Sequence, residues 1–391
     1  MGHETRRELK IVPPQFSVVE HQRDVCACRN CEKTDTSVPF LKARMPEPVI
    51  KGSFAAPESV AHIMTQKFVM ASPLYRLEQE FERNGILLSR QTMSNWLIRC
   101  AEDWLAPLYE KMKSDLLKQC VLFADETTLQ VLREPGKAAQ TKSYMWLYRT
   151  GGDVAHSIVL YEYQPDRRPI HPMNFLRGFK GYLHADGYDG YHKLPGSIVV
   201  VGCWSHCRRK YFEALNSLPE DARKGSTAAR GLEYCNQLFD IERKLSELTP
   251  EDRHAKRQEL AKPIMDEFFA WAESLKVVPK SAIGRAVNYS LSQRKYLERY
   301  LLDGRLECSN NRSERSIKPF VIGRKNWLFN KTPRGARASS IIYSIIEAAK
   351  ENGLNPYDYL TFVFKTAPNV DFRNDPDALE SLMPWQKPEP N

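Results

Sequence analysis

Three acidic residues stand where a fold can bring their carboxylates together. Asp125 follows the apolar run VLFA, Asp186 follows GYLHA, and Glu314 lies in NNRSERSIKPF, a helix-like stretch crowded with Arg and Lys. Carboxylates gathered in this way can hold two cations about 4 Å apart, which is the arrangement that catalyses phosphoryl transfer. Basic residues around them would bind a polyanion. The three settings together predict an enzyme that acts on DNA.

The distribution of charge supports a polyanionic substrate. The chain has 391 residues and a formal net charge of +9. Between residues 305 and 337 only Glu307 and Glu314 oppose nine basic residues: Arg305, Arg312, Arg315, Lys318, Arg324, Lys325, Lys331, Arg334 and Arg337. A solvated basic face is the ordinary explanation of such a run. Because this run encloses a candidate metal-binding carboxylate, we interpret it as a phosphate-binding surface.

Composition argues against membrane and secreted classes. No apolar stretch approaches the roughly 20 residues of a membrane span, and the opening MGHETRRELK has no apolar signal core. The nine cysteines are odd in number and irregularly spaced, which favours a reducing compartment over a disulfide framework. We therefore expect a cytoplasmic location and no membrane partner.

The first 50 residues contain half of a zinc-binding pattern. Cys28 and Cys31 have the C-x2-C spacing of a zinc ribbon, but a tetrahedral site needs two further ligands. His21 is poorly spaced to supply one of them. We expect residues 1–50 to be a partial zinc-ribbon-like segment with an incomplete Zn²⁺ site, and free surface thiols are the alternative.

Residues 51–118 have helical periodicity. Gly85 marks a turn, and Ser89 is placed to cap a helix that exposes Arg90, Gln91 and Asn95. Two helices joined by a short turn suit a helix-turn-helix DNA-binding region, with Arg90 as a DNA contact. A packed helical hairpin without DNA contact is the alternative.

A β-rich pattern follows and predicts the catalytic core. Strands are expected at 120–132, 142–149, 155–163, 181–186 and 197–204, with a short helix near 167–178. This order fits a ribonuclease-H-like core, in which the middle of the first strand lies beside the end of the fourth. Asp125 and Asp186 occupy those two places.

The predicted fold class is therefore mixed α/β (α+β). Residues 119–345 form the ribonuclease-H-like domain, interrupted by a helical insertion at about 205–305. Residues 346–391 form a C-terminal helical segment and a loose tail.

Neighbouring acids compete for each of the three positions. Glu126 faces away from Asp125 in a strand, so a structural role is favoured. Asp189 lies beyond the end of its strand, and Glu307 lies upstream of the predicted helix. Glu314 is preferred to Glu307 because Asn310 and Asn311 precede it as candidate helix caps. Lys318 then lies one turn later on the same face, placed to bind phosphate, although an ordinary surface ion pair with Glu314 is the alternative.

Two further groups of residues have functional and structural interpretations. Cys203, His206 and Cys207 have metal-like spacing but lack a fourth ligand, so we favour a buried cysteine and a histidine that contacts DNA. Trp204, Trp327 and Phe329 can stack on unpaired bases or pack in the core. Trp327 is the better stacking candidate, because Arg324, Lys325 and Lys331 surround it.

The motifs in this order resemble those of insertion-sequence-66 family transposases. They are DET at 125–127, DGYDGY at 186–191, CWSHCRRK at 203–210, NNRSERSIKP at 310–319, GRKNWLF at 323–329 and ENGLNPYDYL at 351–360. The resemblance covers about residues 10–387. It also implies a first C-x-x-C pair upstream, and this chain opens just after the place where that pair is expected.

The resemblance implies a DDE transposase that cuts the ends of its mobile element and joins them to target DNA. Asp125, Asp186 and Glu314 would be the catalytic residues and the ligands of Mg²⁺ or Mn²⁺. Double-stranded DNA, as terminal inverted repeats and target, would be the substrate, and a homo-oligomer with small accessory proteins is implied. The predicted DNA contacts are Arg90, His206, Arg315, Lys318, Arg324, Lys325 and Trp327. A truncated or non-catalytic repressor that binds the repeats is one alternative, and a structure-specific nuclease is another.

Overall fold

The computed structural model describes residues 3–10, 15–27, 29, 33 and 40–386. The chain divides into two compact units, Met1–Glu47 and Pro48–Asn391. In the first unit, β1 (Val25–Ala27) pairs antiparallel with β2 (Phe40–Lys42), and both strands are exposed. Cys28 and Cys31 lie outside the described residues, so the zinc site expected there remains a prediction.

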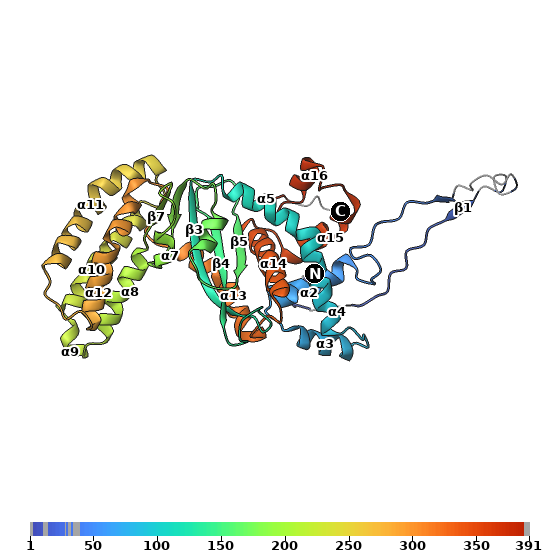
Figure 1. Ribbon diagram of the computed structural model, residues 1–391, viewed down its shortest axis with the longest axis horizontal. Helices are drawn as coiled ribbons and strands as arrows, with labels where there is room; N and C mark the ends of the chain where they lie inside the picture. The colour runs from blue at the N-terminus through green and yellow to red at the C-terminus, as the bar shows by residue number, and fades with distance from the viewer. Residues whose placement is uncertain (1–2, 11–14, 28, 30–32, 34–39, 387–391) are drawn as a thin grey trace. The chain divides into compact units, whose positions relative to one another are not determined.

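The second unit is built on a mixed five-stranded sheet with the strand order β5-β4-β3-β6-β7 (Figure 1). The strands are β3 (Val121–Gln130), β4 (Lys142–Thr150), β5 (Val159–Gln164), β6 (Gly181–His184) and β7 (Ile198–Val201). The first three pair antiparallel, whereas β6 and β7 extend the sheet as parallel strands beside β3. The predicted mixed α/β class is confirmed.

Helices cover the sheet because its strands are apolar on both faces. Consecutive residues Met145, Trp146, Leu147 and Tyr148 of β4 are all buried, a pattern typical of a strand covered on both sides. Helix α14 (Pro333–Glu351) packs along β5, and α13 (Asn311–Trp327) packs against β3 and β4. The short helices α6 (Ile170–Phe175) and α7 (Asp189–His192) lie in the connections before and after β6.

Helices precede the sheet, as the periodicity predicts. They are α2 (Pro57–Phe68), α3 (Leu74–Arg83), α4 (Arg90–Cys100), the π-helical turn η1 (Ala101–Leu105) and α5 (Ala106–Leu116). The predicted cap at Ser89 is confirmed, because its side chain accepts a hydrogen bond from the Thr92 amide at 3.1 Å. Gly85 makes the turn with φ of 77°, a value that glycine adopts without strain.

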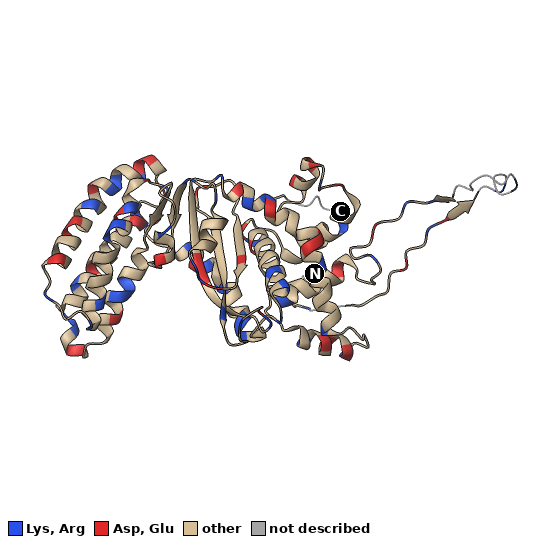
Figure 2. Cartoon of the chain, in the orientation of Figure 1, with Lys and Arg blue, Asp and Glu red and all other residues tan. Residues whose placement is uncertain are grey.

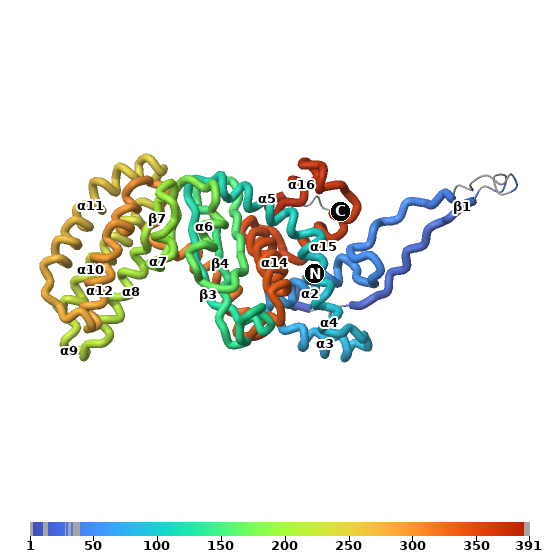
Figure 3. Tube along the Cα trace, in the orientation of Figure 1, coloured from blue at the N-terminus to red at the C-terminus, as the bar shows by residue number. Residues whose placement is uncertain are grey.

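A helical bundle separates β7 from α13, as Figure 3 shows along the chain trace. It comprises α8 (Trp204–Asn216), α9 (Glu220–Arg223), α10 (Thr227–Lys244), α11 (Pro250–Ser274), α12 (Ala282–Leu297) and η2 (Glu298–Leu302). Figure 2 shows both signs of charge interspersed along α10, α11 and α12. Trp204 is fully buried here and its indole donates to the Leu297 carbonyl at 3.1 Å. Base stacking by Trp204 is therefore wrong, because its ring fills the core of the bundle.

The chain ends in packed structure as far as it is described. Helix α15 (Pro356–Thr366) is followed by η3 (Ala367–Asn369) and α16 (Pro376–Ser381). Leu382 and Met383 are buried, and the Tyr359 hydroxyl donates to the Leu382 carbonyl at 2.7 Å. The expected loose tail is wrong for these residues, because two apolar side chains after α16 anchor the segment. Among the described helices, none is long and apolar enough to cross a membrane.

Candidate active site at the end of the central strands

Strands β3 and β6 carry two of the predicted acids to the same end of the sheet, near the carboxyl end of β6. Their parallel pairing aligns Phe123 with His184, and Asp125 and Asp186 each lie two residues beyond that pair. The Asp125 carboxylate accepts a hydrogen bond from the Glu126 amide at 2.8 Å. The Asp186 carboxylate accepts one from the Tyr188 amide at 2.9 Å, which turns the chain after the strand. The topology thus brings the two carboxylates to adjacent strands.

Asn310 fixes the start of α13 beside the same strand. Its side-chain amide donates to the Ala124 carbonyl at 2.8 Å, next to Asp125. Asn310 occupies the cap position, but its side chain makes no capping hydrogen bond. The predicted capping role of its side chain is therefore wrong, because the amide binds the strand instead. This contact places Glu314, in the first turn of α13, near the acids of the sheet.

The electrostatics of Asp125 show that the acids share one environment. Burial raises the pKa of Asp125 well above its usual range, and the charges of Glu126, Asp186 and Glu314 raise it further. The Glu126 amide opposes this increase. A bound cation would reverse the repulsion among these carboxylates.

The contacts of Glu126 support a structural role. Its side chain is 2% exposed, and it accepts hydrogen bonds from Arg167 and, at 2.6 Å, from the Tyr191 hydroxyl. Burial and Asp186 raise the pKa of Glu126, although Tyr191 and Arg167 oppose them. Its carboxylate oxygens are engaged by partners other than a metal.

The two rival acids point elsewhere. The side chain of Asp189 is 72% exposed and forms an ion pair with Lys193 at 2.7 Å. Glu307 forms an ion pair with Arg312 at 2.6 Å. Neither residue is among the groups that raise the pKa of Asp125. This supports the preference for Asp186 and Glu314.

Glu314 faces the start of helix α8. One carboxylate oxygen, Oε1, lies 3.7 Å from Nδ1 of His206, and the other lies 3.5 Å from a terminal nitrogen of Arg209. Both His206 Nδ1 and Glu314 Oε1 are buried atoms without a hydrogen-bond partner. Sequence reasoning missed Arg209. The available signal was its place in CWSHCRRK, one helical turn after His206.

The helical bundle also reaches the loop after β6. A side chain at Gly187 would come within 3.1 Å of the Tyr289 ring on α12. A side chain here would be tighter than ordinary van der Waals contact, so the Tyr289 ring would have to shift by a few tenths of an ångström. No local pattern in the sequence links Tyr289 to Asp186, because the contact depends on how the bundle folds.

The predicted DNA contacts differ in how free their side chains are. Arg90, Arg315, Lys318 and Lys325 are exposed, and His206 and Trp327 are half-buried. Trp327 packs on Phe320, with ring centroids 5.5 Å apart, and under the Lys67 ammonium at 5.4 Å.

Arg324 is already engaged within the fold. It donates to the Thr128 carbonyl and to the hydroxyls of Thr127 and Thr128 at 3.1 and 3.0 Å, which ties α13 to β3. A structural role is therefore favoured for Arg324. DNA binding by the other residues stays a prediction.

The donor set of the three acids suits a hard cation. Asp125, Asp186 and Glu314 offer only carboxylate oxygens, and Glu314 Oε1 has no hydrogen-bond partner. Oxygen ligands favour Mg²⁺ or Mn²⁺ over softer metals. The residues therefore fit the expected ions.

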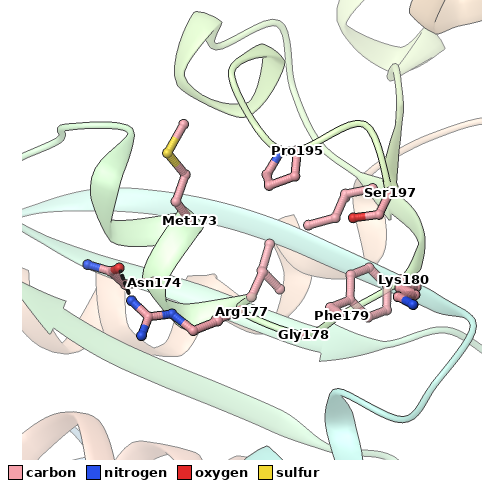
Figure 4. Close-up of a pocket in the computed structure, with 10 residues that line it drawn as sticks. Met173, Asn174, Arg177, Gly178, Phe179, Lys180, Pro195 and Ser197 are labelled. Carbon is pink, nitrogen blue, oxygen red and sulfur yellow. Dashed lines mark hydrogen bonds between the residues drawn. The ribbon is translucent and has the colours of Figure 1, made fainter.

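A cavity of about 340 Å³ lies at the opposite end of the sheet, where β6 and β7 begin (Figure 4). Lys180 lines it immediately before β6, and Ser197 lines it immediately before β7, whereas Asp186 follows the far end of β6. Within it, Arg177 donates to the Asn174 side chain at 2.9 Å. This cavity is separate from the cluster of acids.

Known family models match the part of the chain that forms the sheet and the helical bundle. Residues 52–338 match the model described as the transposase IS66 family, and residues 344–385 match the IS66 C-terminal element. Residues 1–32 match the zinc-finger binding domain of transposase IS66. The chain belongs to the IS66 transposase family.

Three relatives of this IS66 family member come from Sinorhizobium fredii (strain NBRC 101917 / NGR234). The uncharacterized proteins y4qI and y4jD are each 31% identical over 98% of the chain, covering 71% and 75% of their own lengths. The uncharacterized protein y4hP is 28% identical over 99% of the chain and 71% of its own length. The similarity therefore spans the bundle and the sheet alike.

Proposed function

We propose that this IS66 family member is a DDE transposase that cleaves the ends of its mobile element and joins the 3′-OH ends to target DNA. The observation that carries the proposal is the shared environment of Asp125, Asp186 and Glu314, in which two of these carboxylates raise the pKa of the third. Buried carboxylates that repel one another are a feature of functional sites that bind cations.

The sheet supports a ribonuclease-H-like core as part of this proposal. Three antiparallel strands, extended by two parallel ones beside β3, are the expected arrangement. Asp125 and Asp186 lie at the expected places on these strands. We propose this core for residues 119–345, with α8–α12 as its insertion. Residues 51–118 would be the helix-turn-helix-like DNA-binding region, preceded by the zinc-binding segment 1–50 and followed by the C-terminal segment 346–391.

Each acid has a proposed role in the reaction. Asp125, in the central strand, would contact both metal ions, with Asp186 on one side and Glu314 on the other. Two Mg²⁺ ions, or Mn²⁺, would activate the attacking water or 3′-OH and stabilise the leaving oxygen. Arg209 orients the Glu314 carboxylate by a contact of 3.5 Å. The exposed side chains of Arg315 and Lys318 on the same helix would bind phosphates of double-stranded DNA.

Joining two element ends requires that both be held at once. We therefore propose a homo-oligomer on the DNA, assisted by small accessory proteins of the same element. The mass of the complex with a labelled repeat duplex, measured by light scattering, tests this. A single chain bound to two ends would contradict it.

The decisive experiment is Mg²⁺-dependent nicking and joining of a labelled duplex carrying the element's terminal repeat. Asp125→Asn removes the central carboxylate, and Asp189→Asn is the matched control because Asp189 is an exposed acid close to Asp186. We expect cleavage and joined products from the unmodified chain and the control, and neither from Asp125→Asn. Binding without cleavage in all three would instead indicate a non-catalytic repressor. Cleavage without joining would indicate a nuclease.

A further inference from the structure

The Cys203-x2-His206 motif supplies no ligand to the proposed Mg²⁺ site, yet the fold places it against Glu314. Cys203 is the cap residue of α8, and His206 lies in the first turn of that helix. One ligand atom from each of Cys203, His206 and Glu314 can be chosen so that all three lie within 4.8 Å of one another. The three residues come from two helix starts that are over 100 positions apart in the chain.

The distance between His206 and Glu314 is close to that between two ligands of a tetrahedral metal site. Ligands of a tetrahedral Zn²⁺ ion lie about 3.3–3.6 Å from one another, given bond lengths of about 2.0–2.3 Å. His206 Nδ1 and Glu314 Oε1 are 3.7 Å apart, and neither atom has a hydrogen-bond partner. Both side chains are partly exposed, at 24% and 31%, so a small rotation can close the remaining gap.

The sulfur of Cys203 is also placed as a ligand. It is buried and accepts a hydrogen bond from the Asn310 backbone amide at 3.1 Å. Burial raises the pKa of the thiol to about 11, and this hydrogen bond opposes the increase. Cys207, the other cysteine of the motif, contacts the Ser290 hydroxyl at 3.2 Å in the core of the bundle. The third ligand is therefore Glu314 from another helix, and not Cys207 from the same one.

We propose that Cys203, His206 and Glu314 form a binding site for a thiophilic divalent cation such as Zn²⁺, with a fourth position open to water or substrate. Sulfur and imidazole ligands select Zn²⁺ over Mg²⁺. Binding releases the proton of the Cys203 thiol to solvent, as the metal replaces it on sulfur. Glu314 would then be shared between two sites of different preference.

Competition for Glu314 follows, and this step rests on the proposed function. A carboxylate oxygen that binds Zn²⁺ beside Cys203 is turned toward α8 and withdrawn from the hard cation beside Asp125. Zn²⁺ therefore acts as an inhibitor of the Mg²⁺-dependent reaction. Inhibition requires the thiol and the imidazole, neither of which ligates the hard cation.

The first test measures bound zinc without any DNA. The full chain is dialysed against Zn²⁺ and its metal content is determined for the unmodified protein, Cys203→Ser, His206→Gln and the control Cys207→Ser. We expect the first two variants to lose one equivalent of Zn²⁺ relative to the unmodified chain, and Cys207→Ser to lose none. The N-terminal cysteines are present in all four proteins, so their contribution cancels. Equal zinc content in all four would overturn the site.

Two measurements guard against misfolding and identify the carboxylate. Circular dichroism establishes that each variant is folded. His206→Gln keeps the test valid if Cys203→Ser does not fold, because the His206 side chain is partly exposed. Glu314→Gln should weaken Zn²⁺ binding at least about 10-fold, since even residues that only support a ligand contribute that much to metal affinity. Unchanged affinity in Glu314→Gln would exclude it as a ligand.

The second test measures inhibition. The ratio of cleavage rates without and with Zn²⁺, at fixed Mg²⁺, should be large for the unmodified chain and close to one for Cys203→Ser. Zinc bound at the site without an effect on cleavage would overturn the competition. Zinc binding that depends on Cys203, in a chain that never cleaves DNA, would overturn the proposed function and leave the cation site standing.

Discussion

The helical bundle and the end of the central strands both bury charged groups. In the bundle the buried charge has partners, whereas at the end of the strands like charges lie together. In the bundle, the side chain of Arg257 is 1% exposed, forms an ion pair with Glu242 at 2.5 Å and donates to the carbonyls of Tyr300, Asp303 and Leu306. At the end of the central strands, Asp125 lies among like charges, and Oε1 of Glu314 has no hydrogen-bond partner.

The difference separates a structural use of charge from a functional one. A buried charge with all its hydrogen bonds made fixes the position of the elements around it. A buried charge that lacks partners lowers stability, and it is retained where a ligand will supply the missing partner. We therefore expect substitutions in the bundle to affect folding, and substitutions among the acids to affect the reaction.

The largest expected effect comes from the central acid. Asp125→Asn should lower the rate of DNA cleavage by about 1,000-fold, as expected when a group that stabilises developing charge is lost. The variant should unfold at a denaturant concentration no lower than that of the unmodified chain in chelator-treated buffer, because one repelling charge is gone. Cleavage assays measure the rate, and urea titrations measure the stability. Loss of stability together with activity would break the distinction between the regions.

The reverse pattern is expected in the bundle. Glu242→Gln leaves Arg257 buried without a counter-charge and should lower the free energy of unfolding by about 3–5 kcal/mol. Denaturant titration measures this change, with Glu233→Gln on the exposed face of the same helix as control. An equal, small effect of both variants would show that the carbonyls alone satisfy Arg257.

Glu162 tests whether a buried carboxyl oxygen without a hydrogen-bond partner lowers the stability of the fold away from the site. Burial raises the pKa of Glu162 on β5 to about 7, against the attraction of Lys113, and its Oε2 atom has no hydrogen-bond partner. The folded chain therefore holds a proton that the unfolded chain releases, and stability falls as the pH rises from about 4.5 to about 7.

Glu162→Gln removes this pH dependence. The variant should be more stable than the unmodified chain by about 2 kcal/mol at pH 8, after allowance for solvent screening, and equal to it near pH 4. Urea titrations at the two pH values measure the difference. Glu233→Gln, which changes an exposed acid of α10, serves as control and should match the unmodified chain at both pH values.

The smallest effect concerns phosphate binding along α13. Lys318→Gln should reduce the slope of log affinity against log salt concentration by about 0.9, because one phosphate contact is lost. Its stability should not change, since the side chain is exposed. Arg324→Gln should instead lower stability, because it breaks the contacts with Thr127 and Thr128. Filter binding over a range of salt, and thermal melts, separate the two; an unchanged slope for Lys318→Gln would exclude it as a phosphate contact.

The sequence predicted the strands, and the positions of Asp125 and Asp186 on them, because both depend on local patterns. An apolar run of β-branched and aromatic residues predicts a strand, and the acid that ends the run, Asp125 or Asp186, has a defined position on that strand. The cap at Ser89 likewise follows from spacing. The burial of Glu126 was not expected from the sequence.

The surroundings of Glu314 could not be predicted in this way. His206 and Arg209 meet it from a helix that begins over 100 residues earlier, and Asn310 binds a strand instead of capping its own helix. Such contacts arise from the packing of the bundle on the sheet. A side chain that is free by its local pattern, such as that of Arg324, can donate hydrogen bonds to a distant strand.

Helix α14 carries a consequence for how this chain can be divided. The two family matches separate between residues 338 and 344, inside Pro333–Glu351. That helix packs along β5, and its last residue, Glu351, pairs with the buried Arg149 of β4 at 3.0 Å. A chain truncated at residue 338 would cut a continuous helix, uncover the apolar face of the sheet and leave Arg149 without its counter-ion. The segment that matches a family model of its own is thus packed into the same compact unit as the sheet.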